Sequence, residues 1–200
     1  MIAFEPPVAT HVRTPIVALP VAAGGVSLLL ARPWLVSAGA GAAGLALLYL
    51  AVGAMALTVP HARLIDPGGS IRSRALSPVH PGVALIIGVG AFVVARMAQV
   101  PVAPLSAAAS AIALDVMAAV AEEAFFRRFL YSALLPFGAA LAIVLSGLAF
   151  AFVHVPLYGG AVFWVDLGAG LLLGWQRWAS GSWTVTAATH VAANILAVLR

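Results

Sequence analysis

Seven apolar runs, each close to the length that crosses a bilayer as a helix, constrain this sequence most strongly. They cover residues 15–31, 34–59, 81–100, 103–135, 137–155, 161–179 and 183–199. Only 8% of the residues are charged, whereas a soluble domain carries about 25%. Inside lipid a chain must satisfy its backbone hydrogen bonds internally, which a helix does within one segment. The sequence therefore predicts an all-α, polytopic transmembrane bundle of about seven helices.

The runs divide the chain into three parts. Residues 1–14 form an N-terminal lead, and residues 15–102 hold three transmembrane helices. Residues 103–200 hold four more helices, from which we expect the polar site to be built. Closely spaced glycines, such as Gly168 and Gly170, favour a close approach between helices.

A basic loop sets the expected orientation in the membrane. Residues 61–80 carry three arginines, which outnumber the single aspartate of the loop. The positive-inside rule places this loop in the cytoplasm, so the N-terminus lies in the cytoplasm and the C-terminus outside. Arg32, near the expected opposite face, does not fit this pattern.

Composition also excludes several classes of function. The chain has no cysteine, so it has no disulfide, no thiol nucleophile and no thiolate metal site. Its 10 basic residues are scattered and form no basic run, so the positive net charge indicates topology rather than nucleic-acid binding. We expect the lipid bilayer, and not nucleic acid, around this chain.

Polar side chains inside the apolar runs mark the candidate site. A charge at the bilayer centre costs ~2.5–3.5 kcal/mol, so the adjacent Glu122 and Glu123 are a functional-site hypothesis by default. At ~1.5 Å of rise per residue, Glu122 lies ~21 Å and His154 ~27 Å from the cytoplasmic turns. His190 and Asn194 lie at ~15 Å and ~21 Å, so four polar side chains share one slab of the membrane.

The spacing of charges gives the two glutamates different expected roles. Glu123 precedes Arg127 by four residues, the favourable order for an ion pair, so Glu123 is expected to be structural. Glu122 points about 100° away on the helix and has no partner there, so we expect it to be unpaired. An unpaired, desolvated carboxylate suits a general base.

Packing roles compete with these chemical roles. A lone histidine inside the membrane often only bonds one helix to another, and this applies to His154 and His190 taken singly. Asp115 and Asp166 are expected to be mainly structural, although Asp115 lies two turns from Glu122 on a similar face.

Three motifs together resemble the CPBP family, which comprises the type II CAAX prenyl endopeptidases and the bacterial Abi-type proteins. In chain order they are EExxxR (Glu122, Glu123 and Arg127), FxxxH (Phe150 and His154) and HxxxN (His190 and Asn194). Each motif lies in a separate expected span. The resemblance covers roughly residues 103–199.

The resemblance implies a glutamate-type intramembrane endopeptidase. Glu122 would activate a water molecule, with His154 helping to hold it. His190 and Asn194 would stabilise the oxyanion of the tetrahedral intermediate. Three further motif residues would support the site: Glu123, Arg127 and Phe150.

A metal is the alternative reading of the same residues. The family is commonly labelled as metalloproteases, and Glu122, His154 and His190 form a His₂Glu set like those that hold catalytic Zn²⁺. The sequence lacks the HExxH arrangement, and the resemblance also covers enzymes read as metal-free. We assign no metal and keep Zn²⁺ as the alternative.

The implied substrate is a membrane-anchored or lipidated protein or peptide, cut in CAAX-type processing or in sorting-type cleavage of a C-terminal tail. We expect an integral protein of the bacterial plasma membrane.

Two other functions compete with this endopeptidase. The first is a catalytically silent CPBP-like protein that binds, or gives immunity to, a membrane-active peptide. The second is a small proton-coupled transporter, although the sequence shows no internal repeat.

Overall fold

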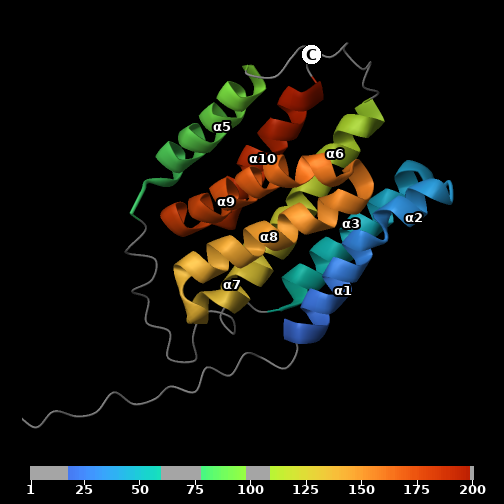
Figure 1. The fold of residues 1–200 in the computed structure, drawn as a ribbon, viewed down its shortest axis with the longest axis horizontal. Coiled ribbons are helices and arrows are strands. Elements are labelled where there is room, and N and C mark those ends of the chain that lie inside the picture. The colour runs from blue at the N-terminus through green and yellow to red at the C-terminus, as the bar shows by residue number, and fades with distance from the viewer. Residues whose placement is uncertain (1–17, 60–77, 98–108, 199–200) are drawn as a thin grey trace, which may run out of the picture.

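The computed structural model describes residues 18–59, 78–97 and 109–198, and all of its regular elements are helices (Figure 1). The N-terminal lead 1–14 and nearly all of the basic loop 61–80 lie outside the described residues. The orientation inferred from that loop therefore stays a prediction.

The described residues form seven helical segments, which confirms the predicted all-α bundle. The first three are α1 (Ala18–Leu30) with α2 (Arg32–Ser37), then α3 (Gly41–Thr58), then α5 (Pro81–Met97). The fourth joins α6 (Ala109–Glu123), the π-helix η2 (Ala124–Leu130), α7 (Tyr131–Leu134) and the 3₁₀ turn η3 (Leu135–Phe137). The last three are α8 (Ala139–Tyr158), then α9 (Phe163–Ser180) after the 3₁₀ turn η4 (Gly160–Val162), then α10 (Trp183–Val198).

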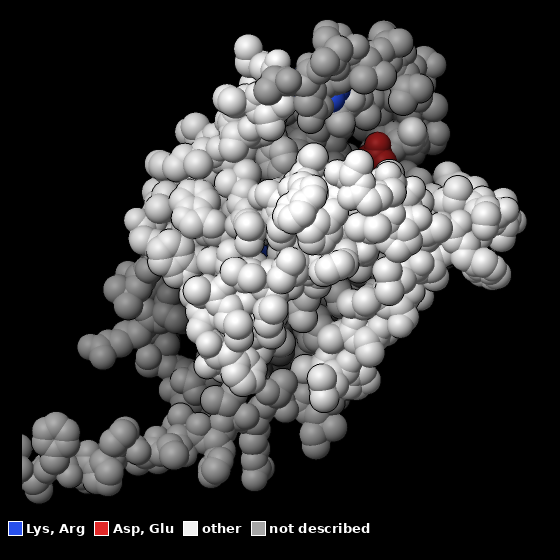
Figure 2. Space-filling view, in the orientation of Figure 1, with Lys and Arg blue, Asp and Glu red and all other residues white. Residues whose placement is uncertain are grey.

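The outer surface of the bundle suits a bilayer. Three helical stretches are long and apolar enough to cross a membrane, namely Ala18–Ser37, Gly41–Thr58 and Ala139–Tyr158. Large apolar side chains such as Leu19, Met97 and Trp164 are exposed. In the face that Figure 2 shows, charged atoms of the described residues are visible at only a few points. These features fit an integral membrane protein.

The boundary expected between the first two spans is wrong. The sequence pattern ends one span at residue 31 and begins the next at residue 34, but α2 continues the first segment to Ser37. Pro33 interrupts the helical hydrogen bonds, because it lacks an N–H group and its ring clashes with the carbonyl four residues earlier. The helical segment nevertheless continues through this interruption. The reversal comes later, at Gly39 and Gly41, which both have positive φ. Arg32 consequently lies inside a membrane segment.

Helices α8 and α9 approach each other closely through glycine. A Cβ atom on Gly170 would lie 2.8 Å from the backbone oxygen of Gly147, too close for any real contact. The predicted close approach at these small residues is therefore present at Gly170, whereas a Cβ on Gly168 would meet nothing within 4 Å. The contact brings the Gly170 carbonyl within 3.1 Å of Arg127 Nη2, which donates to it.

Gly170→Ala is expected to destabilise the bundle by about 1–3 kcal/mol, because the added methyl group must push α8 and α9 apart. Thermal unfolding in detergent measures the loss. Gly168→Ala is the matched control, since its methyl group enters open space on the same helix. Equal melting temperatures for the two variants would contradict the packing described here.

Candidate active site

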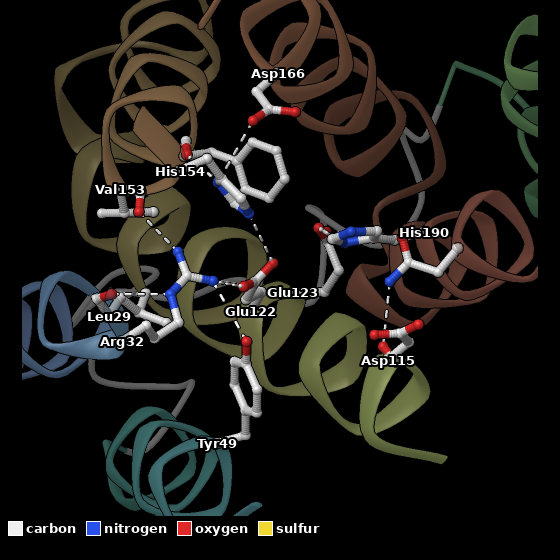
Figure 3. A network of polar contacts seen from close by, with 12 residues as sticks. Leu29, Arg32, Tyr49, Asp115, Glu122, Glu123, Val153, His154, Asp166 and His190 are labelled. Atoms are coloured by element: carbon white, nitrogen blue, oxygen red, sulfur yellow. Dashed lines mark hydrogen bonds and ion pairs between the residues drawn. The ribbon is translucent and has the colours of Figure 1, made fainter. Parts of the chain in front are cut away.

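A cavity of about 760 Å³ lies between helices of both halves of the chain. All four predicted catalytic side chains line it: Glu122, His154, His190 and Asn194. They come from α6, α8 and α10, and the close-up in Figure 3 shows Glu122 in the middle of the polar network. Most of the remaining wall is apolar and comes from α5, α9 and α10.

Glu122 is buried and bonded through one of its two carboxylate oxygens. Its Oε1 accepts a hydrogen bond from Arg32 Nη1 at 2.7 Å. Its Oε2 lies 3.6 Å from His154 Nε2. The prediction that Glu122 is unpaired is therefore wrong, because its partner is 90 residues away and comes from α2 rather than from its own helix.

Arg32 donates to three further groups. Its Nε donates to the Leu29 carbonyl at 2.8 Å, and its Nη2 donates to the Val153 carbonyl at 2.7 Å (Figure 3). Its Nη1 also reaches the Tyr49 hydroxyl on α3 at 3.5 Å. The polar site expected from the C-terminal four helices thus extends to α2 and α3.

The second carboxylate, Glu123, forms the predicted ion pair. Its Oε1 lies 2.9 Å from Arg127 Nη1, and both side chains are completely buried. The Arg127 guanidinium carbon also lies 4.6 Å from the centre of the Phe150 ring, a cation–π contact. Arg127 belongs to η2, and π-helical turns of this kind are frequent at functional sites.

His154 has a different group at each ring nitrogen. Nδ1 donates to the Phe150 carbonyl at 2.7 Å, which leaves Nε2 facing Glu122. The carboxylate of Asp166 lies 3.9 Å from Nδ1, and Tyr158 stacks on the ring at 6.0 Å between centroids. Asp166, expected to be mainly structural, therefore borders the site and lines its cavity.

His190 and Asn194 line the same cavity but bond away from Glu122. The Nδ1 of His190 lies 3.1 Å from Glu123 Oε1, so this histidine is paired with the structural carboxylate. The Asn194 amide donates to the backbone oxygen of Asp115 at 3.2 Å. Phe150 contacts His190 edge to face, at 5.6 Å between ring centroids.

The arrangement does not fit a zinc ion held by Glu122, His154 and His190. Among the described residues, no three histidine or carboxylate side chains are grouped closely enough to hold a metal. The Arg32 guanidinium already provides the cation beside Glu122, and His190 turns its Nδ1 to Glu123. We derive no step through a metal.

Comparison with known proteins places the motifs in a family. Residues 104–196 match the model of the family described as type II CAAX prenyl endopeptidase Rce1-like. This stretch is an Rce1-like domain. All the motif residues of the site lie within it, whereas Arg32 and Tyr49 lie outside it. No curated protein and no solved structure matches the chain.

Sequence reasoning missed Arg32 because it treated that residue as an exception to the topology. One signal was available. Arg32 is the only charged residue between positions 14 and 60, in the middle of apolar sequence. A charge in such surroundings needs a partner within the membrane, and Glu122, which has no partner on its own helix, is the natural candidate.

Glu123→Ala is expected to destabilise the protein by about 3–5 kcal/mol, because it leaves the Arg127 guanidinium buried without its counter-ion. Thermal unfolding in detergent measures the effect. The double variant Glu123→Met with Arg127→Met removes both charges and should lose less stability than the single variant. A double variant at least as unstable as the single one would show that the pair is not the cause.

Proposed function

We propose that this protein is an intramembrane endopeptidase that hydrolyses a peptide bond of a membrane-anchored protein with a water molecule activated by Glu122. Membership of its Rce1-like domain in a family of CAAX endopeptidases suggests the protease. The observation that carries the mechanism is the pair Glu122 Oε2 and His154 Nε2, which face each other across 3.6 Å in the cavity.

That separation is too long for a direct hydrogen bond but suits one bridging water. Such a water directs one hydrogen to the Glu122 carboxylate and the other to Nε2 of His154, whose Nδ1 carries the ring proton. Its lone pair is then free to attack the scissile carbonyl carbon. Glu122 takes the proton of the attacking water, as a general base.

Collapse of the tetrahedral intermediate returns that proton. Glu122, now protonated, transfers it to the departing amine nitrogen as the C–N bond breaks, so the carboxylate is regenerated. No covalent intermediate forms, and no cysteine exists to form a thioester. Because neither step requires a metal, we propose a metal-free glutamate protease.

His190 and Asn194 supply the oxyanion donors in this scheme. The Asn194 amide has a second N–H beyond the one given to the Asp115 carbonyl. His190 directs Nδ1 to Glu123, so its other ring nitrogen, Nε2, is the one proposed to donate to the oxyanion. Donors aimed where negative charge develops are the main source of rate enhancement in reactions of this type.

The substrate class follows from where the site lies along the bundle. In Figure 1, α2 and the C-terminal end of α8 lie at the end of the bundle opposite α7. The turn after α7 is cytoplasmic in the topology predicted from the basic loop. We therefore propose that the site opens toward the outer face of a bacterial plasma membrane and acts on an exported or membrane-anchored protein.

A fusion reporter after Arg200 tests that topology. We expect a periplasmic reporter such as alkaline phosphatase to be active there and a cytoplasmic reporter to be inactive, because the seventh segment ends outside. The same reporters placed in the loop 61–80 serve as the internal control and should give the reverse result. Cytoplasmic activity after Arg200 would overturn the proposed substrate class.

Glu122→Gln is expected to abolish cleavage in detergent while leaving the protein folded, because the amide cannot accept the proton of the water. Wild type is tested on a panel of membrane-anchored peptides, with and without a chelator. His154→Ala should also be inactive, whereas His80→Ala, a histidine outside the cavity, should retain activity.

The outcomes separate the competing functions. Cleavage that survives the chelator and is lost in Glu122→Gln supports the proposal. Cleavage lost with chelator and restored by Zn²⁺ would instead make the site a metal centre. Immunity to a membrane-active peptide that persists in Glu122→Gln would favour the catalytically silent binding protein.

A further inference from the structure

Backbone carbonyls of two helices fix the position of the Arg32 side chain. Pro33 cannot donate to the Leu29 carbonyl four residues earlier, and Arg32 Nε donates to that oxygen instead. On α8, Arg32 Nη2 donates to the Val153 carbonyl, which lies three residues before Pro156. Two edges of the guanidinium are therefore held by backbone atoms of two helices.

The direction of the remaining nitrogen, Nη1, is then fixed by the plane of the guanidinium. Nη1 points at Glu122 Oε1, at 2.7 Å, with the Tyr49 hydroxyl at 3.5 Å as its other neighbour. Guanidinium donors form a rigid fork, so fixing two of them fixes the third. The anchored Oε1 in turn directs Oε2 toward His154 (Figure 3).

We propose that Arg32 is a positioning residue of the active site, which holds the Glu122 carboxylate ionised and turned with Oε2 toward His154. This inference rests on the proposed function, since it explains how the general base is prepared. It also assigns part of the site to α2, outside residues 104–196 that match the family. The first helical segment is then a component of the catalytic centre.

Several other titratable groups line the cavity beside Glu122 or flank it on its own helix. They lie on its own helix and on four others: Asp115 and Glu123, Tyr49 on α3, His154 and Tyr158 on α8, Asp166 on α9, and His190 on α10. Among the described residues, Arg32 is the guanidinium that donates to this carboxylate. Arg127, the other buried arginine nearby, is paired with Glu123.

The test uses two substitutions at Arg32 and one matched control. Arg32→Gln removes the charge, and Arg32→Lys keeps the charge but loses the planar fork. Arg128→Gln is the control, because Arg128 also joins two helices by donating to the Ala56 carbonyl of α3, yet it lies outside the cavity. Size-exclusion chromatography and thermal unfolding in detergent establish that each variant is folded.

The first readout needs no substrate. Dicyclohexylcarbodiimide modifies protonated carboxyl groups in apolar surroundings, and mass spectrometry of peptides locates the modification at Glu122. In Arg32→Gln the rate should rise at least about tenfold, because an opposite charge so close favours the ionised carboxylate. Wild type, Arg32→Lys and Arg128→Gln should all react slowly.

The second readout is turnover of a peptide that wild type cleaves. Arg32→Lys should lower kcat by about 100-fold with little change in KM, as expected when a reacting group is misplaced by about 1 Å. A purely structural role would leave kcat of the folded Lys variant close to that of Arg128→Gln.

Each outcome decides the inference. Unchanged labelling of Glu122 in folded Arg32→Gln overturns it, whether or not the protein is a protease. If Arg32→Gln does not fold, a wild-type kcat in Arg32→Lys overturns it and a reduced kcat supports it. If Glu122 is labelled faster in Arg32→Gln but wild type cleaves no peptide, the role of Arg32 in positioning Glu122 is supported and the proposed protease is rejected.

Discussion

The burial of two adjacent carboxylates in an apolar bundle is the constraint on which the rest of this structure depends. Desolvating a charge costs several kcal/mol, and the cost is recovered only when counter-charge and hydrogen bonds are both supplied. Arg32 and Arg127 supply the counter-charge to Glu122 and Glu123. Each guanidinium also takes backbone acceptors. These are the Leu29 carbonyl four residues before Pro33, the Val153 carbonyl of α8, and the Gly170 carbonyl at the close glycine contact between α8 and α9.

The two carboxylates share this chemistry but differ in access, and the difference separates their roles. Glu123 is completely buried and shares one oxygen between Arg127 and His190. Glu122 lines the cavity and keeps Oε2 directed at His154. An adjacent pair on one helix can diverge in this way because neighbouring side chains point about 100° apart. A pair closed off from the cavity therefore stands directly beside a carboxylate that lines it.

Sequence reasoning could predict the features that depend on local spacing. The helical segments follow from the length of the apolar runs. The Glu123–Arg127 pair and the family motifs follow from spacings within one helix. It could not predict Arg32 as the partner of Glu122, because nothing local relates residues 90 positions apart. The span boundary expected between residues 31 and 34 also hid this partner. A charged residue followed by a proline, as at Arg32 and Pro33, resembles a loop in sequence. The bonds from His190 to Glu123 and from Asn194 to the Asp115 backbone depend on helix rotation and tilt, which hydropathy does not specify.

These contacts give the N-terminal helices more than an anchoring role. The Rce1-like stretch contains both carboxylates, but its buried Arg127 is committed to Glu123, and its buried Arg177 donates to the Arg127 carbonyl. The balancing charge for Glu122 therefore comes from α2. Burying an ion without a partner is far more costly than burying a hydrogen-bonded pair, so docking of α2 against α8 and preparation of the candidate base are one event. A fold that separated the two halves would expose an uncompensated charge on each, which couples assembly of the bundle directly to the chemistry of its cavity.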